Sequence, residues 1–153
     1  MQAVCKDNGV SPREQNVVSL ALRLPWFDDA TVQGLMAGGK DYLDHVLSDE
    51  QLSLYRVVTR DGHRFPELSR RYHKEVVSGR TEILVKCVDR CARTNKGKIR
   101  SPRNAGNSFE ALVRAGLFED ALHRTRALES VEIVAHARSV ATAMRKLMQA
   151  EIL

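Results

Sequence analysis

The positions of the four prolines, together with apolar residues spaced three and four apart, constrain this chain most strongly. Pro12, Pro66 and Pro102 each stand where a helix would begin, and Pro25 stands where one would end. No segment alternates apolar and polar residues with a period of two, which a half-buried strand would require. The chain of 153 residues has the size of one domain. The sequence therefore predicts a single all-α domain.

Six helices are predicted from this spacing, at residues 11–24, 29–47, 48–61, 66–96, 101–122 and 128–148. Ser48 and Gln51 form a capping-box pattern at the start of the third helix. Gly38 and Gly39 lie inside the second helix, where a bend is one expectation because glycine lowers helix stability. Gly79 is the expected weak point of the fourth helix.

Charge is distributed unevenly along the chain. The formal net charge is +5, whereas residues 60–103 alone carry +8. Only Phe65 and Tyr72 are aromatic in that segment, so a platform for stacking bases is poorly supported, and a solvated helix face is the simpler interpretation. The alternative function is a basic helical nucleic-acid-binding protein that grips phosphates with residues 86–103. Its candidate side chains are Lys86, Arg90, Arg93, Lys96, Lys98, Arg100 and Arg103.

No apolar run approaches the roughly 20 residues that a membrane-spanning helix needs, and the N-terminus lacks the features of a secretory signal. The three cysteines are an odd number without the spacing of a disulfide framework, so we expect a reducing compartment, the cytoplasm. Cys87 and Cys91 lie four residues apart and could join a metal site, but their apolar neighbours favour two buried core residues. We expect no metal ligand and no cofactor.

The usual catalytic and phosphate-binding motifs are absent from the sequence, so we expect no catalytic residue and no enzymatic activity. Residues from the second to the fifth predicted helix could instead enclose a ligand cavity. An ordinary filled core is the alternative for the same pattern. The candidate ligand-binding residues are Leu35, Met36, Tyr42, His45, Tyr55, Val58, Tyr72, Leu84, Cys87 and Phe109.

Two stretches resemble the C-terminal domain of TetR-family transcription regulators. The first is residues 47–58 with the corner Arg64-Phe65-Pro66-Glu67-Leu68 that follows, and the second is residues 111–119. The resemblance extends over residues 18–147. It implies an all-helical domain that senses a small apolar or amphipathic molecule, and whose last two helices pair with a second copy as a four-helix dimer interface.

Two apolar faces of the last predicted helices are compatible with that interface. Both faces could instead pack within one chain. The candidate interface residues are Val113, Leu117, Ala121, Val134, Ala137, Ala141, Met144 and Met148.

The resemblance divides the chain into two parts. Residues 1–17 form an N-terminal extension, for which both an ordered and a disordered state are open, and residues 18–153 form the ligand-binding and dimerisation domain. Family members carry a helix-turn-helix domain before this one, and residues 11–47 fit that motif poorly because their connecting segment is long and their second helix is acidic. We therefore expect a truncated or stand-alone sensor without direct DNA binding. It would form a homodimer, or a heterodimer that modulates a full-length regulator of the family.

Overall fold

The computed structural model describes residues 24–95 and 98–153, and it confirms the all-α prediction. Those residues contain helices and no strand. The elements are α2 (Val32–Val46), α3 (Asp49–Asp61), α4 (Pro66–Tyr72), the π-helical turn η1 (His73–Val77), α5 (Ser78–Thr94), α6 (Pro102–Arg114), α7 (Leu117–His123) and α8 (Ser130–Gln149). The predicted N-terminal extension and nearly all of the first predicted helix lie outside the described residues.

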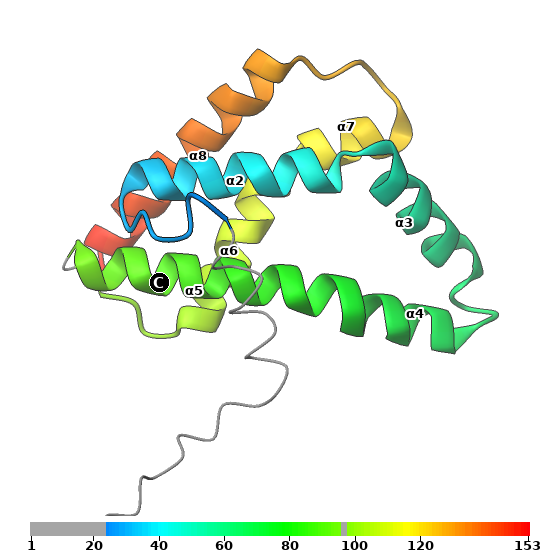
Figure 1. The fold of residues 1–153 in the computed structure, drawn as a ribbon, viewed down its shortest axis with the longest axis horizontal. Helices are drawn as coiled ribbons and strands as arrows, with labels where there is room; N and C mark the ends of the chain where they lie inside the picture. Colours follow the sequence, from blue (N-terminus) through cyan, green and yellow to red (C-terminus); the bar gives the residue numbers. More distant parts are fainter. Residues whose placement is uncertain (1–23, 96–97) are drawn as a thin grey trace, which may run out of the picture.

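Two long helical rods organise the domain (Figure 1). α2 runs in one direction, and α4, η1 and α5 return as one continuous rod in the opposite direction, with α3 joining them at one end. α6 crosses the second rod and packs on α5, while α8 packs on α2.

Short-range signals set the helix starts as predicted. The Ser48 hydroxyl accepts a hydrogen bond from the Gln51 backbone N–H at 3.3 Å, which caps α3. Ser101 caps α6 in the same way through Asn104 N–H, and Pro102 follows as its first residue. Each signal acts over three residues, so it can be recognised without knowledge of the tertiary structure.

Three details differ from the prediction. The fifth predicted helix is broken into α6 and α7, because Gly116 adopts a φ of +80° that a helix cannot contain. α2 continues through Gly38 without interruption, since this glycine makes room for the Trp26 ring instead of marking a bend. The irregularity in the fourth predicted helix is the π-helical turn η1, and Gly79 lies in regular helix just after it.

The core lies where α5, α6, α2 and α8 meet. Gly106 allows α6 to approach α5 closely, because an added Cβ would lie 2.7 Å from the Cα of Val85 on α5. The largest side chains with less than 2% exposure are Phe109, Leu35, Leu43, Leu84, Met144, Val88, Val113 and Cys91. Helix packing of this density is a major source of stability for such a domain.

Candidate ligand-binding site

Two hollows flank Tyr42 on α2. The larger has a volume of about 300 Å³ and the smaller of about 40 Å³. Tyr42 and Arg80 contribute to the walls of both, so the two hollows adjoin at these side chains. The larger is otherwise lined by Leu24, Trp26, Gly38, Asp41, His45, Ile83 and Leu84. The smaller is otherwise lined by Val46, Gln51, Tyr55, Tyr72, Val77, Arg114 and Phe118.

The structure distributes the predicted ligand-binding residues over three places. Tyr42, Tyr55 and Tyr72 line the smaller hollow, and Tyr42, His45 and Leu84 line the larger one. The others line neither hollow: Leu35, Phe109 and Cys87 are buried in the core, and Met36 and Val58 are half-buried.

Sequence reasoning missed the polar part of the site. Arg80, Arg114 and Gln51 line the smaller hollow, and Trp26 lines the larger one. Arg80 stands one helical turn before Leu84, so the face it shares with a predicted lining residue could have indicated it.

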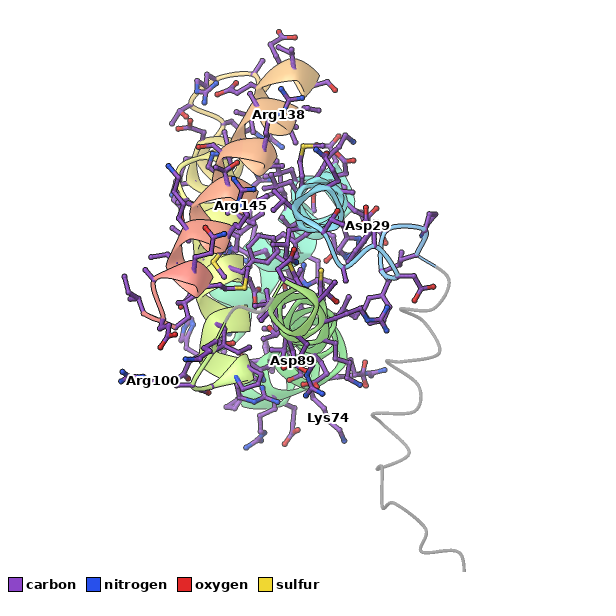
Figure 2. All side chains as sticks on the ribbon, turned by 90° about the vertical axis from the view of Figure 1, so that its left-hand side faces the viewer. Asp29, Lys74, Asp89, Arg100, Arg138 and Arg145 are labelled. Carbon is purple, nitrogen blue, oxygen red and sulfur yellow. The ribbon has the colours of Figure 1, made fainter. Side chains whose placement is uncertain are left out.

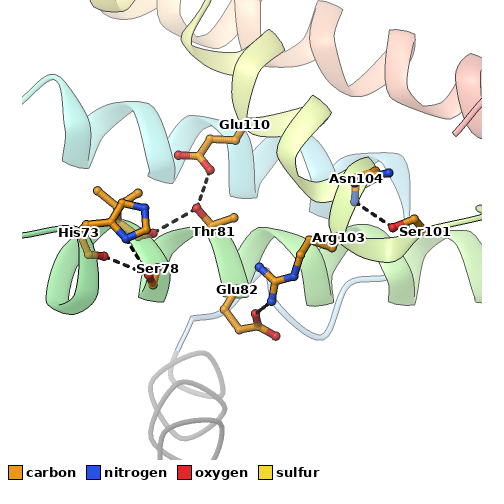
Figure 3. A network of polar contacts seen from close by, with 9 residues as sticks. His73, Ser78, Thr81, Glu82, Ser101, Arg103, Asn104 and Glu110 are labelled. Atoms are coloured by element: carbon orange, nitrogen blue, oxygen red, sulfur yellow. Dashed lines mark hydrogen bonds and ion pairs between the residues drawn. The ribbon is translucent and has the colours of Figure 1, made fainter. Parts of the chain in front are cut away.

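A carboxylate connects three helices beside Tyr42. The Tyr42 hydroxyl of α2 donates a hydrogen bond of 2.7 Å to Glu110 on α6. The Thr81 hydroxyl of α5 donates one of 2.7 Å to the other oxygen of the same carboxylate (Figure 3). Burial, with the charge of Glu110 as a second cause, raises the pKa of Tyr42 well above its ordinary value. Tyr42 therefore stays protonated and keeps this donor role at neutral pH.

Two arginines of the site have no carboxylate partner among the described residues. The Arg80 Nε atom is buried without a hydrogen-bond acceptor, and its Nη2 lies 3.4 Å from the Tyr72 hydroxyl. Arg114 stacks on Phe118 with its guanidinium carbon 4.0 Å from the ring centroid. Neither guanidinium forms an ion pair with residues 24–95 or 98–153. The walls of the smaller hollow therefore carry two guanidinium groups and no carboxylate from the described residues.

Further buried polar atoms in the walls lack partners. Gln51 Oε1 in the smaller hollow and Trp26 Nε1 in the larger one find no hydrogen-bond partner among the described residues. Because a buried polar atom without a partner costs free energy, such atoms are rare in folded proteins. Three of them around Tyr42 indicate a site with unused hydrogen-bonding capacity.

His45 lies at the edge of the larger hollow. Partial desolvation of its ring, with the positive charge of Arg80 as a second cause, lowers the pKa of His45 below its ordinary value. The ring is therefore neutral at pH 7, and it adds no positive charge to the site.

The two described cysteines are core residues, as predicted from their neighbours. Burial raises the pKa of Cys87 to about 12, and burial also raises the pKa of Cys91. Among residues 24–95 and 98–153, no group of three or more His, Cys, Asp or Glu side chains could hold a metal ion.

The basic segment proposed for nucleic acid is partly neutralised by ion pairs. Arg93 pairs with Asp89 at 2.8 Å, and Arg90, Lys98 and Arg103 also have carboxylate partners. Arg90 further stacks on the Phe27 ring. Lys96 lies outside the described residues. These pairs weigh against a continuous phosphate-binding strip, because acidic side chains such as Asp89 lie among the basic ones (Figure 2).

Six of the eight residues predicted for a dimer interface are buried within the single chain. They are Val113, Leu117, Ala137, Ala141, Met144 and Met148. Ala121 and Val134 are half-buried. The heptad-like seam of α8 thus faces its own domain, where α8 packs on α2 and on α6. His136 strengthens the second contact, because its Nε2 lies 3.0 Å from the Val113 carbonyl oxygen of α6.

Within the described part of the chain, no helix has both the length and the apolar character needed to cross a membrane.

The described residues thus form an all-α domain with two hollows beside Tyr42, one of them largely apolar. A family model for the C-terminal domain of AefR-like transcriptional repressors matches residues 33–147, so the chain belongs to this family of TetR-type regulator domains. Searches of curated proteins and of solved structures gave no match. TetR-type C-terminal domains are regulatory rather than enzymatic, and they typically bind small molecules and dimerise.

Proposed function

We propose that this domain senses a small amphipathic molecule, which binds in the larger hollow and contacts the polar groups around Tyr42. The observation that carries the proposal is the pairing of an apolar space of about 300 Å³ with buried polar atoms that lack partners. Ligand sites typically combine apolar walls with a few fixed polar groups in this way. The regulator family supplies the context in which such binding controls transcription.

Trp26 offers a direct test, because it is the one tryptophan of the chain and lines the larger hollow. We expect a ligand retained in native mass spectrometry, or added afterwards, to change the Trp26 fluorescence. Ile83→Phe should fill part of the hollow and weaken binding at least tenfold. Val57→Phe is the matched control, since Val57 lies on α3 outside the hollow and is 40% exposed. Equal binding by both variants would contradict the assignment.

We further propose that the domain forms a homodimer through the outward faces of α6 and α8. Since the apolar seam of α8 is used within the chain, a partner would contact the opposite face. Ala135, Ser139, Thr142 and Ala143 share that face, and their short side chains would allow a second helix to approach closely. Val131, which is 78% exposed, begins the same face.

Light scattering tests the dimer. The expected mass is about twice 17.2 kDa, and Ser139→Arg should reduce it to that of one chain. Thr59→Arg, on the exposed side of α3, is the matched control and should leave the dimer intact. A single-chain mass for the unmodified protein would refute the proposal.

The same face of α8 would also accept a subunit of a related regulator. We therefore propose, as the alternative to the homodimer, a heterodimer that modulates a full-length family member. Co-expression with a tagged family member, followed by affinity purification, tests it. The heterodimer would be supported if this chain is recovered together with the tagged regulator and if Ser139→Arg abolishes that recovery. Recovery of the two homodimers alone would count against it.

A further inference from the structure

We propose that the ligand of this site carries a carboxylate, with Arg80 as its main partner and its apolar body in the larger hollow. This inference rests on the proposed ligand-sensing function and specifies the chemical class of the ligand. It draws on the charge, the geometry and the size of the space around Tyr42.

The charge of the site favours an anion. Arg80 and Arg114 border the smaller hollow, and neither has a carboxylate partner among the described residues. Glu110 is a nearby carboxylate, but both of its oxygens already accept short hydrogen bonds, from Tyr42 and from Thr81. Within the described part of the chain, the walls of the smaller hollow thus contain two guanidinium groups and no carboxylate, whereas the carboxylate of Asp41 lines the larger hollow.

The geometry favours Arg80 as the partner. This side chain lines both hollows, so it can bind an acid group while the rest of the molecule occupies the larger space. Its Nε atom is buried and has no acceptor among the described residues. A guanidinium presents parallel donors that match the two oxygens of a carboxylate. The Tyr72 hydroxyl, 3.4 Å from Arg80 Nη2, could donate an additional hydrogen bond to the same group.

The two volumes fit the two parts of an amphipathic acid. The smaller hollow, of about 40 Å³, has room for one or two water molecules or for a group of similar size such as a carboxylate. The larger hollow is bordered by the Trp26 ring, Ile83 and Leu84, which suit an alkyl or aromatic body. A cationic or uncharged polar head would leave the Arg80 Nε without an acceptor of opposite charge.

The test compares three probes that share one chain and differ in the head group: octanoate, octanol and octylamine. Binding is followed by Trp26 fluorescence at neutral pH. We expect octanoate to bind roughly tenfold or more tightly than octanol, because a hydrogen bond to a charged group is stronger than one between neutral groups. Octylamine should bind most weakly. Octanol binding as tightly as octanoate would overturn the carboxylate assignment while leaving the ligand-sensing function in place.

Variants then locate the charge. Arg80→Gln should abolish the preference for octanoate over octanol. Arg93→Gln is the matched control, because it removes the same charge from the same helix at a side chain that is 78% exposed. If Arg80→Gln loses helical circular dichroism, Arg80→Lys replaces it and should reduce the preference severalfold. A preference for octanoate that survives in Arg80→Gln, or that Arg93→Gln also abolishes, would overturn the proposal.

The proposed function and this inference fail differently. If no probe changes Trp26 fluorescence and no mass is retained in native mass spectrometry, the ligand site itself is refuted. If all three probes bind equally, the site stands and the carboxylate inference is refuted.

Discussion

The contact between α5 and α6 can be tested by comparing two glycines, one that is tightly packed and one that has open space beside it. At Gly106, an ideal Cβ would lie 2.7 Å from the Val85 Cα and 3.0 Å from the Val85 backbone nitrogen. At Gly79, nothing lies within 4 Å of the added Cβ. Both residues are helical, so each alanine substitution gains the same intrinsic helix preference, at most about 1 kcal/mol.

The packing decides the difference between the two variants. Carbon atoms in contact prefer about 3.5–4.0 Å, so Gly106→Ala must push the α6 backbone roughly 1 Å away from α5. The obstacle is backbone, which cannot move aside by side-chain rotation, and such overpacking costs about 1–3 kcal/mol. We therefore expect Gly106→Ala to lower the free energy of unfolding by about 1–2 kcal/mol. Gly79→Ala should raise it by about 0.5–1 kcal/mol.

Urea unfolding followed by far-ultraviolet circular dichroism measures both effects. The slope with denaturant should stay the same, because neither variant changes the surface exposed on unfolding. In thermal unfolding, Gly106→Ala should melt about 3–6 °C lower and Gly79→Ala about 1–3 °C higher. Equal protein concentrations are required, since dimerisation would shift both values. Shifts of the same sign and size in the two variants would refute the described α5–α6 contact.

Three further predictions follow from buried side chains. Phe109→Ala should cost about 3–5 kcal/mol of unfolding free energy in urea, because Phe109 is fully buried, whereas Phe65→Ala should cost little since Phe65 is 58% exposed. Burial raises the pKa of Cys87 to about 12, so the unfolded chain loses the Cys87 proton at a lower pH than the folded chain does. This difference should lower the free energy of unfolding by about 1.4 kcal/mol per pH unit between about pH 9 and 12. A Cys87→Ala variant whose stability declines equally steeply would contradict this. Tyr42→Phe should cost about 1–2 kcal/mol in thermal unfolding by removing the donor to Glu110, and an unchanged melting temperature would exclude that hydrogen bond.

Local signals made the helix starts predictable. The Ser48 hydroxyl caps a backbone N–H three residues away, and Pro102 has a backbone angle that already suits a helix. The glycines were harder to interpret, because the effect of Gly38 depends on Trp26, which lies outside the helix. The π-helical turn at His73–Val77 also left no signal that local propensity could reveal.

The candidate site was predicted only in part, for a physical reason. Aromatic residues at helical spacing indicate an inward face, and Tyr42, Tyr55 and Tyr72 do line the smaller hollow. Arg80 and Arg114 have no such signal, because an arginine in a helix usually faces solvent. Their role depends on having no carboxylate partner within the described residues, which no sequence pattern reports.

The helical character of the chain and the starts of its helices follow from apolar periodicity and from capping groups within a few residues of one another. The family resemblance follows from two short stretches of sequence. That the apolar seam of α8 is buried within its own domain, and that Arg80 lines two hollows, depends on how distant helices pack. Helix faces and crossing points are set by the sum of many weak contacts between distant segments, and no single residue encodes that sum.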